Sequence, residues 1–264
     1  MPDRARATPD PTSSGTPNPT GPARCRRCQT RPVVGPFPLA VERPVGPTYA
    51  AVLSRQPRAV LLAALAGERF TGWVGPDEDG WCVAVPQAPA GHVARRRRHV
   101  DDLARLLAAG SPVPVASVKV EADAVLHLWA GTRDGELLDY TSDVSSQGGE
   151  WSVDPFGNPV PPPEGPSGAE RAGVLARALG HPDATDELTD LLLEDLGEST
   201  SEAERLERVA RLLGWPGWLV SVGSLPRGVP GGPELRAFTR LRAGRGGVPG
   251  VLVERLTRVV RRRS

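Results

Sequence analysis

The amino-acid sequence predicts an α+β fold in which an antiparallel sheet, formed by a hairpin and a meander, has helices packed on one side. Two β-rich runs, Arg69–Val74 and Trp81–Val85, flank a polar loop bounded by glycines, which is typical of a hairpin. Apolar residues at helical spacing follow over 99–109, and three further β-rich runs occupy 113–141. Helical patterns dominate from residue 167, so the C-terminal part is predicted to be mainly helical.

Composition divides the chain into a tail and one domain. Residues 1–33 consist mainly of Pro, Thr, Ser, Gly and Arg, so they are predicted to be a disordered N-terminal arm. Residues 34–264 are predicted to form a single α+β domain, with a sheet part over about 34–142 and a helical part over 167–264. A loop rich in Pro, Gly and Ser, 143–166, joins the two parts.

The region before and within the hairpin gives four predictions. Prolines among the apolar residues of 33–44 favour an extended lead-in to the sheet. Tyr49–Leu53 is predicted as a short helix. Ala59–Ala66 fits a buried strand or a helix equally well, because a short apolar run has no distinguishing period. The polar segment Gly75–Gly80 is the predicted hairpin loop.

The helix over 99–109 and the meander have clear sequence boundaries. Two aspartates occupy the first turn of this helix, and Gly110 follows where a C-cap glycine is common. The meander is predicted as three strands, Val113–Val120, Ala124–Trp129 and Glu136–Thr141, with a turn at Gly131–Gly135.

Three helices are predicted after the long loop. The third begins with a capping box, Ser201-Glu-Ala-Glu204. Beyond it, Trp218–Val222 is predicted as an edge strand and 251–263 as a basic amphipathic helix, separated by a stretch rich in Gly and Pro. The predicted helices are Ser167–Leu179, Asp183–Leu196 and Ser201–Leu213.

Charge and cysteine content exclude several classes of protein. The formal net charge is +1, too small for the whole molecule to attract nucleic acid strongly. The longest apolar run, Ala59–Gly67, is too short to span a bilayer, and Met1–Arg4 leads into polar residues rather than a secretory signal. Three cysteines do not make a disulfide framework. We therefore expect a cytoplasmic protein without a transmembrane segment, and we do not expect nucleic acid as a partner.

Part of the chain resembles a bacterial family of unknown function. About half of the chain shares the family's pattern, and the resemblance implies one α+β domain without implying any activity. The three prolines of 161–163 and the C-terminal tail depart from that pattern. The residues that carry the resemblance are Gly72-Trp-Val74, the 99–109 helix leading into Pro114–Val118, Asp123-Ala-Val-Leu126, Gly135-Glu-Leu-Leu-Asp-Tyr140 with Ser142, and the helix ending in Leu213-Gly214.

No residue pattern indicates a metal, a cofactor or a catalytic group. Cys25 and Cys28 have the spacing of half a zinc ribbon, but the second ligand pair of a closed zinc site is missing. The sequence contains no Gly-x-Ser-x-Gly elbow, phosphate loop or dinucleotide fingerprint. We therefore predict no metal site and no cofactor. The histidines, which show no metal-ligand spacing, are His92, His99, His127 and His181.

Carboxylates stand out in two places. Glu136 and Asp139 lie in one predicted strand, where alternation puts them on opposite faces, so that they would not share acid–base work. A second group, between Asp183 and Glu207, makes the predicted helices acidic. The ordinary interpretation of this group is a solvated helix face, and the alternative is a patch that receives a basic partner.

Three hypotheses for function remain open on the sequence. The leading one is a non-enzymatic protein-interaction or regulatory domain, because tryptophans at a turn can anchor a partner and the charge is unevenly distributed. The second is an enzyme with a site near Asp123, His127, Asp139 and Tyr140. The third is a nucleic-acid or membrane-surface binder that uses arginine-rich segments. The candidate partner-binding residues of the first hypothesis are Trp215, Trp218, Arg95, Arg96, Arg97 and Arg98.

Overall fold

A computed structural model describes residues 46–93, 98–144, 152–153, 155–156, 158–160, 165–194 and 201–246. All of these residues belong to one compact unit, Arg43–Ser264. The predicted N-terminal arm, the extended lead-in over 33–44, the arginines of 95–97 and the predicted helix over 251–263 lie outside the described residues.

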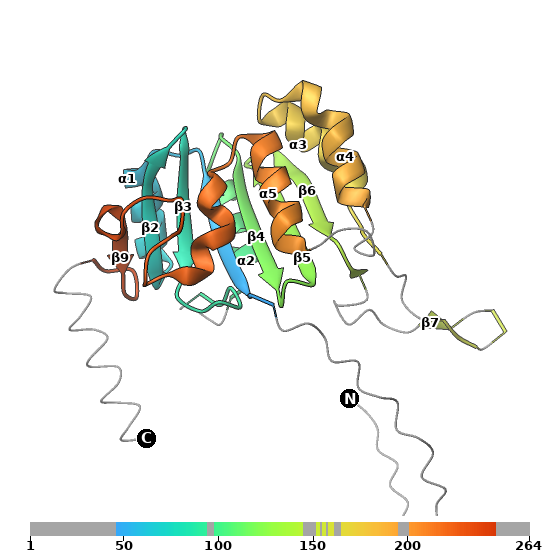
Figure 1. Cartoon of the computed structure of the whole chain (residues 1–264), viewed down its shortest axis with the longest axis horizontal. Helices are drawn as coiled ribbons and strands as arrows, with labels where there is room; N and C mark the ends of the chain where they lie inside the picture. The colour runs from blue at the N-terminus through green and yellow to red at the C-terminus, as the bar shows by residue number, and fades with distance from the viewer. Residues whose placement is uncertain are drawn as a thin grey trace, which may run out of the picture. The chain divides into compact units, whose positions relative to one another are not determined.

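Seven strands form one antiparallel sheet with the order β6-β5-β4-β1-β3-β2-β9 (Figure 1). β1 lies in the interior of the sheet, paired with β4 on one side and with β3 on the other. A separate two-stranded ladder joins β7 and β8. The strands are β1 Tyr49–Ser54, β2 Gly72–Glu78, β3 Trp81–Pro86, β4 Val115–Glu121, β5 Val125–Thr132, β6 Gly135–Thr141, β7 Ser152–Val153, β8 Pro159–Val160 and β9 Thr239–Leu241.

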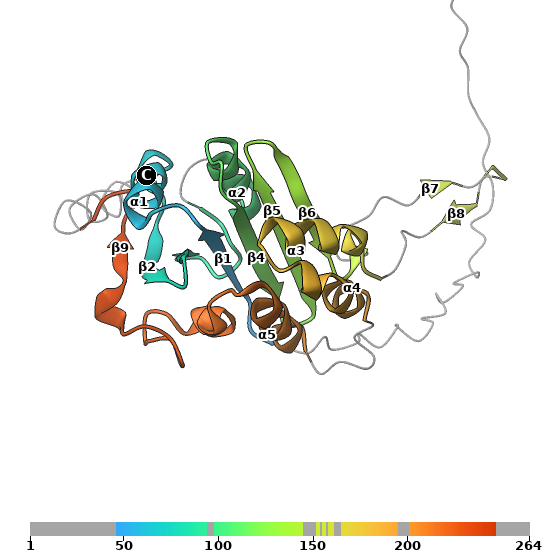
Figure 2. The same cartoon turned by 90° about the horizontal axis from the view of Figure 1, so that it is seen from above.

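Helices cover both faces of this sheet (Figure 2). The predicted α+β class, antiparallel sheet and helical C-terminal part are confirmed, but the helices are not confined to one side. α1 and α2 cover one face, and α3, α4, α5 and the 3₁₀-helix η4 cover the other. The helices are α1 Arg58–Gly67, α2 Val100–Ala109, α3 Ala172–Ala178, α4 Thr185–Leu193 and α5 Glu202–Leu213, with 3₁₀ turns η2 Ala169–Arg171, η3 Pro182–Ala184, η4 Gly217–Ser224 and η5 Leu235–Ala237.

The central strand explains why both faces need a cover. All six residues of β1 are buried, and the five that precede Ser54 alternate between two hydrophobic clusters. Ala51 and Leu53 join the cluster under α3–α5, whereas Ala50 and Val52 join the cluster under α1 and α2. The prediction of a short helix over Tyr49–Leu53 is therefore wrong, because a strand buried on both faces is apolar at every position and shows no period of two.

The predicted hairpin is confirmed, with a shorter loop. β2 continues through Glu78, and the turn consists of Asp79 and Gly80, both with left-handed backbone conformations. A register shift between Val74 and Asp77 accommodates Gly75 and Pro76 inside the strand. A bulge therefore absorbs the residues that the sequence assigns to the loop.

The edge strand beside the hairpin comes from a different segment than predicted. Trp218–Val222 lies in the 3₁₀-helix η4, and its apolar side chains pack on the sheet. The edge strand is β9, which pairs with β2 and places Arg240 opposite Trp73. Three residues in a stretch rich in Gly and Pro give too short a pattern to indicate a strand.

Candidate functional site

The N-terminus of α5 is attached to the turn between β4 and β5. Ser201 caps the helix, since its hydroxyl accepts a hydrogen bond from the Glu204 amide at 3.2 Å, which confirms the serine half of the predicted capping box. Asp123 accepts a second one from the Ala203 amide at 2.8 Å. Asp123 and Ala122 both adopt positive φ angles, and this turn conformation places the Asp123 carboxylate at the helix end. The first helical residue, Glu202, is fully buried in the protein.

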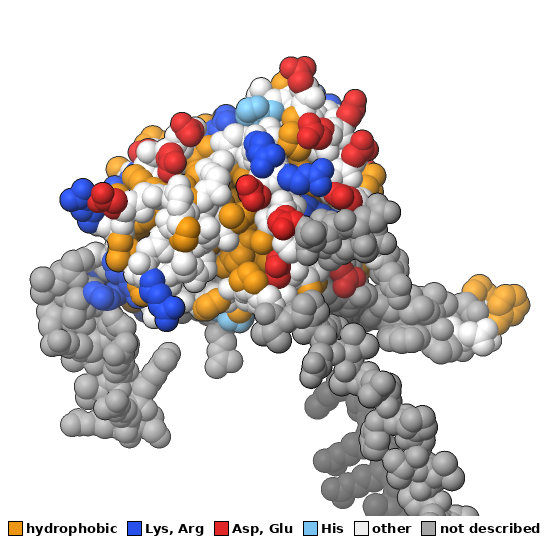
Figure 3. Space-filling view, viewed as in Figure 1, with side chains coloured by type: hydrophobic (Ala, Val, Ile, Leu, Met, Phe, Trp, Pro, Cys, Tyr) orange, Lys and Arg blue, Asp and Glu red, His pale blue; other side chains and the backbone are white. Residues whose placement is uncertain are grey.

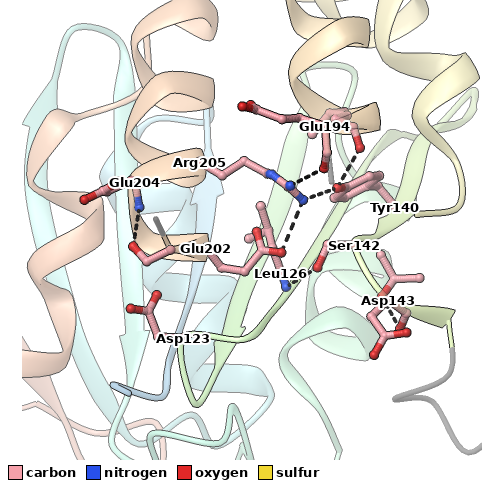
Figure 4. Close-up of polar contacts among 12 residues, drawn as sticks. Asp123, Leu126, Tyr140, Ser142, Asp143, Glu194, Glu202, Glu204 and Arg205 are labelled. Atoms are coloured by element: carbon pink, nitrogen blue, oxygen red, sulfur yellow. Dashed lines mark hydrogen bonds and ion pairs between the residues drawn. The ribbon is translucent and has the colours of Figure 1, made fainter. Parts of the chain in front are cut away.

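Glu202 and Arg205, three residues apart in α5, form an ion pair that is buried in the protein (Figure 4). Their side chains are 0% and 1% exposed, and Arg205 Nη1 lies 3.2 Å from Glu202 Oε1. The same nitrogen donates to the Tyr140 hydroxyl at 3.0 Å, and the other terminal nitrogen donates to the Glu194 carbonyl. Tyr140 in turn donates to the Leu192 carbonyl at 2.9 Å. We name Tyr140, Glu202 and Arg205 the buried polar centre.

The pKa shifts in the buried polar centre follow from burial. Burial raises the pKa of Glu202, an effect that a hydrogen bond with Ser142 and the Arg205 guanidinium oppose and the Asp123 carboxylate reinforces. Burial also raises the pKa of Tyr140 to about 12. The pKa of the neighbouring Tyr49 is raised for the same reason, and the Asp123 and Glu202 charges add to this shift. Both phenols therefore stay protonated at neutral pH.

The buried polar centre holds helices in place and has no access for a substrate. Tyr140 donates to the carbonyl of Leu192, in the last turn of α4, and Arg205 donates to that of Glu194, the residue that follows the helix. Tyr140, Glu202 and Arg205 are each at most 1% exposed, so solvent does not reach them. The arrangement therefore fixes the C-terminal end of α4 and the N-terminal end of α5 on the sheet.

An open groove lies at the protein surface beside α4 and α5. It has a volume of about 640 Å³ and is lined by acidic and apolar residues of α4 together with Arg208 of α5. Leu193 is 54% exposed, and Arg208 pairs with Glu194 at 2.9 Å. Figure 3 shows acidic side chains gathered over the end of the molecule that α3 and α4 form. We name this site the α4–α5 groove, lined by Glu187, Asp190, Leu191, Leu193, Glu194 and Arg208.

The order of the residues in the acidic run indicates an exposed apolar side chain in the α4–α5 groove, which amino-acid composition alone does not indicate. Within the acidic run, Leu191, Leu192 and Leu193 are consecutive, and a helix cannot bury three consecutive side chains on one stripe. Leu191 and Leu192 are buried, and Leu193 points outward among the carboxylates. The run of three leucines therefore leaves one apolar side chain exposed within the acidic segment.

The four residues of the enzyme hypothesis do not meet. Asp123 and Tyr140 belong to the face covered by α5, where Tyr140 is part of the buried polar centre. His127 and Asp139 belong to the face covered by α2, where Asp139 bonds to Arg105 at 2.7 Å. Burial lowers the pKa of His127, while the Glu121 carboxylate, 3.9 Å from its Nε2, acts to raise it. The sheet thus separates the four residues into two pairs.

Glu136 and Asp139 lie on the same face of β6, contrary to the prediction from alternation. A register shift between Ala130 and Gly131 leaves one extra residue in β6, and this bulge reverses the alternation. The Arg105 guanidinium lies 3.9 Å from Glu136 and 2.7 Å from Asp139. Glu136 also accepts from the Trp129 indole at 2.8 Å. Both carboxylates therefore have cationic or donor partners on the partly exposed α2 face.

The predicted partner-binding residues are two buried tryptophans, one arginine that is paired within the protein and three arginines outside the described residues. Trp215 is 5% exposed and lies edge-on to Trp81, and Trp218 is 3% exposed and lies edge-on to Phe238. A partner cannot contact rings that the core already covers, so the structure removes the basis for either tryptophan as an anchor. Arg98 pairs with Glu68 at 2.8 Å, and Arg95, Arg96 and Arg97 lie outside the described residues.

The described ranges contain neither a cluster of metal ligands nor a helix that could span a membrane. There, no three His, Cys, Asp or Glu side chains are placed to hold a metal ion. Cys25 and Cys28 lie outside those ranges. Cys82 is a buried free thiol, and burial raises its pKa to about 12. None of the helices in this part of the chain has the length and hydropathy of a membrane-spanning helix.

Comparison with protein-family models, with curated proteins and with solved structures found no match for this chain. The resemblance carried by the sequence motifs therefore stays a prediction. The geometry of the α4–α5 groove and of the buried polar centre is therefore the basis for the proposed function.

The raised pKa of Glu202 predicts how stability depends on pH. A carboxyl group whose pKa in the folded protein lies above its ordinary value of 4.5 binds a proton more tightly when the chain is folded. Its contribution to stability is therefore greatest below pH 4.5 and declines as the pH rises through its folded-state pKa. We expect wild type to lose stability relative to Glu202→Gln over this interval, as measured by urea unfolding across a pH series.

The amide in Glu202→Gln keeps the shape of the side chain and removes its titration. The difference between the two proteins thus isolates Glu202 from every other titrating group. A difference that stays constant with pH, or that changes in favour of wild type as the pH rises, would contradict the raised pKa.

Proposed function

We propose that this protein is a non-enzymatic protein-interaction domain that binds a basic, amphipathic segment of a protein partner in the α4–α5 groove. The observation that supports the proposal most strongly is the exposed Leu193 within a groove lined by Glu187, Asp190 and Glu194. An amphipathic helix binds such a groove through its apolar side chains, and complementary charges orient it and speed its association.

The buried polar centre supports this proposal because it prepares the groove. Glu194 connects the buried polar centre to the groove. Its carbonyl accepts a hydrogen bond from Arg205 inside the protein, and its carboxylate pairs with Arg208 at the groove. Asp190 and Leu193 are held on one surface by the same attachment of α4 to the sheet. A groove fixed in this way loses little conformational entropy when a partner binds.

The same observations favour binding over catalysis. The two groups of the buried polar centre whose pKa values are raised, Glu202 and Tyr140, are enclosed, and the residues of the enzyme hypothesis lie on two faces of the sheet. We further propose a cytoplasmic location, because the chain has three cysteines and the one that the structure describes, Cys82, is a buried thiol.

The proposal predicts binding of a short fluorescent helical peptide with arginines on one face and leucines on the other. Fluorescence anisotropy is expected to show saturable binding that weakens as the salt concentration rises. Reversing two charges in Glu187→Arg/Asp190→Arg is expected to weaken binding roughly tenfold, or about 1.4 kcal/mol, since two surface ion pairs become repulsive. Leu193→Ser is expected to weaken binding about threefold or more through lost apolar contact.

The matched control reverses two exposed charges in other parts of the chain. In Asp134→Arg/Glu234→Arg the replaced side chains are 79% and 69% exposed, and neither lines the groove. This control is expected to retain wild-type affinity. Equal loss in both double variants would show that only the net charge matters, and the proposed groove would then be wrong. A peptide with glutamates in place of the arginines is expected not to bind.

A further inference from the structure

The first helix of the fold, α1, is apolar on every side. Residues 59–67 of this helix are Ala, Val, Leu and Gly only. Leu61 and Leu65 are fully buried on the sheet, and Leu62 and Ala64 pack against the same hydrophobic cluster. A helix that is hydrophobic all round is usually buried all round. The side of α1 that faces away from the sheet is therefore unusual, because it is exposed.

This exposed side of α1 is a continuous apolar surface. Val60 is 51% exposed, and its neighbours on the helix surface are exposed alanines. Spacings of three and four residues place these side chains next to one another on one side of the helix. Exposed apolar patches commonly mark sites of interaction. We name this surface the α1 outer face, which consists of Ala59, Val60, Ala63 and Ala66.

The part of the chain that the structure describes ends beside α1, at the β9 end of the sheet (Figure 2). The Gly244 amide donates to the carbonyl of Phe70 at 2.7 Å. A Cβ atom at Gly244 would lie 2.3 Å from the carbonyl oxygen of Ala66, so this backbone contacts the C-terminal end of α1. Gly246 is the last described residue. Residues 247–264 therefore start within reach of the α1 outer face.

The sequence of residues 251–263 is complementary to the α1 outer face. In a helix over this range the apolar side chains would form one stripe, with most of the charged side chains on the other side. Such a helix would be about 20 Å long, against about 15 Å for the 10 residues of α1. The stripe would consist of Leu252, Leu256, Val259 and Val260.

The two ends of α1 have different exposed charges nearby. Arg69 is exposed and lies just after the C-terminal end of α1. A short connection then leads into β2, which runs back past α1 and brings the exposed Asp77 and Asp79 to its N-terminal end. Burial is the main cause of the raised pKa of Cys82; the Asp77 carboxylate adds to this shift and Arg58, the first residue of α1, opposes it. Asp77 and the start of α1 therefore lie near the same thiol.

We propose that residues 251–263 dock as a helix on the α1 outer face and run antiparallel to α1. The segment starts at the C-terminal end of α1, so a helix lying along α1 runs back toward its N-terminal end. In this direction Glu254 comes near Arg69, and the arginines of 261–263 come near the hairpin carboxylates. The proposal is independent of the α4–α5 groove, because α4 and α5 cover the opposite face of the sheet.

Disulfide cross-linking in the full chain tests this docking. Serine replaces the two cysteines of residues 1–33, which leaves only the buried Cys82 among the native thiols. In a glutathione redox buffer, Ala63→Cys/Leu256→Cys is expected to form a disulfide within one chain. Its equilibrium constant should exceed that of the matched pair Ala63→Cys/Thr257→Cys by about tenfold or more, because position 257 lies outside the apolar stripe and its Cβ atom is too far from α1.

A second pair of variants tests the direction of the docked segment. Ala59→Cys/Val260→Cys brings two thiols together at the N-terminal end of α1 when the segment is antiparallel. Ala66→Cys/Val260→Cys brings them together only when it is parallel. The first disulfide is expected to form and the second is not, as measured by mass spectrometry of the oxidised chains.

Thermal unfolding tests the apolar contact without introduced cysteines. Leu256→Asp and Thr257→Asp place the same charge at neighbouring positions of the full chain. Leu256→Asp is expected to lower Tm by about 3–12 °C through the loss of a docked leucine. Thr257→Asp, on the solvated side, is expected to change Tm by less than about 2 °C.

Neutralising the hairpin carboxylates tests the role of charge. Asp77→Asn/Asp79→Asn is expected to reduce closure of the first cross-link by about twofold to tenfold, since two surface ion pairs are lost. The control Asp134→Asn removes a carboxylate that is 79% exposed in the β5–β6 turn, and closure is expected to stay unchanged.

The proposal would be overturned by equal disulfide formation at positions 256 and 257, or by equal changes of Tm in the two aspartate variants. Disulfides that join two chains rather than one would assign the α1 outer face to a second copy of the protein. The absence of any cross-link to position 63 would assign this face to a different partner. Either result would contradict docking of residues 251–263.

Discussion

Replacing Arg205 by alanine is expected to lower the free energy of unfolding by about 3–5 kcal/mol at neutral pH, the usual cost of breaking a buried ion pair by removing one partner. The substitution leaves the fully buried Glu202 carboxylate without its counter-ion. It also removes donors to the Tyr140 hydroxyl and to the Glu194 carbonyl at the end of α4. Urea unfolding of the two proteins at neutral pH measures the difference.

Two comparisons test whether the cost of Arg205→Ala comes from the buried ion pair. Arg208→Ala removes an arginine from the same helix, but its side chain is 47% exposed and its pair with Glu194 is solvated, so a cost below about 1 kcal/mol is expected. Acidification should reduce the cost of Arg205→Ala, because burial raises the pKa of Glu202 and the unpaired carboxyl then becomes neutral. Equal costs for the two arginines, or a cost that grows on acidification, would contradict a buried ion pair.

Replacing Gly168 by alanine is expected to cost about 2–5 kcal/mol, because two separate penalties add at this position. Gly168 has a φ angle of +88°, a conformation that disfavours a Cβ atom. The added Cβ would also lie 1.9 Å from the backbone carbonyl oxygen of Asp139, and that oxygen belongs to β6. Ser167 pairs with Thr141 at the end of the same strand, so the backbone cannot move away without losing these bonds.

Gly180→Ala separates the two penalties at Gly168. Gly180 has nearly the same φ angle, +87°, but a Cβ atom there meets nothing within 4 Å. Its cost is expected to be the conformational part alone, about 1–2 kcal/mol. Thermal or urea unfolding of both variants tests the difference. If Gly180→Ala costs as much as Gly168→Ala, the close contact with Asp139 has no energetic role.

Local sequence signals predicted the parts of the fold that local interactions determine. The helix at 99–109 agrees with α2, and its boundaries follow from the first-turn aspartates and from Gly110. The hairpin and the meander agree with β2–β3 and β4–β6, since runs of β-branched and aromatic residues form the strands and turn residues separate them. Ser201 caps α5 as the motif indicates. In each case the deciding interactions lie within a few residues of one another.

Long-range packing determined the elements that the sequence did not predict. Tyr49–Ser54 is a strand because β3 and β4 pair with it and helices cover both of its faces. Trp218–Val222 is apolar enough for a strand, but it packs as a 3₁₀ helix against Tyr49 and other residues of the sheet. β9 exists only through its pairing with β2. No local pattern contains this information.

The sequence indicated that the segment forming the candidate site is acidic, but it did not indicate how its residues are arranged in space. The acidic run between Asp183 and Glu207 was visible, and the groove within it depends on how α4 and α5 pack. The buried polar centre joins Tyr140 to Glu202 and Arg205, which are distant in sequence, so spacing could not indicate it. A single bulge in β6 reversed the expected relation of Glu136 and Asp139, and nothing in the sequence marks that bulge.

The position of β1 has a consequence for biosynthesis. The ribosome makes the N-terminal end first, so Tyr49–Ser54 emerges before either strand that flanks it. The backbone groups on one edge of β1 have their hydrogen-bond partners once β3 is complete at Pro86. Those on the other edge have no partners until β4, Val115–Glu121, has been translated. During that interval an apolar segment has unpaired amides and carbonyls along one edge, the condition in which nascent chains are most prone to aggregate. Translation speed between these segments therefore sets how long the nascent chain is at risk.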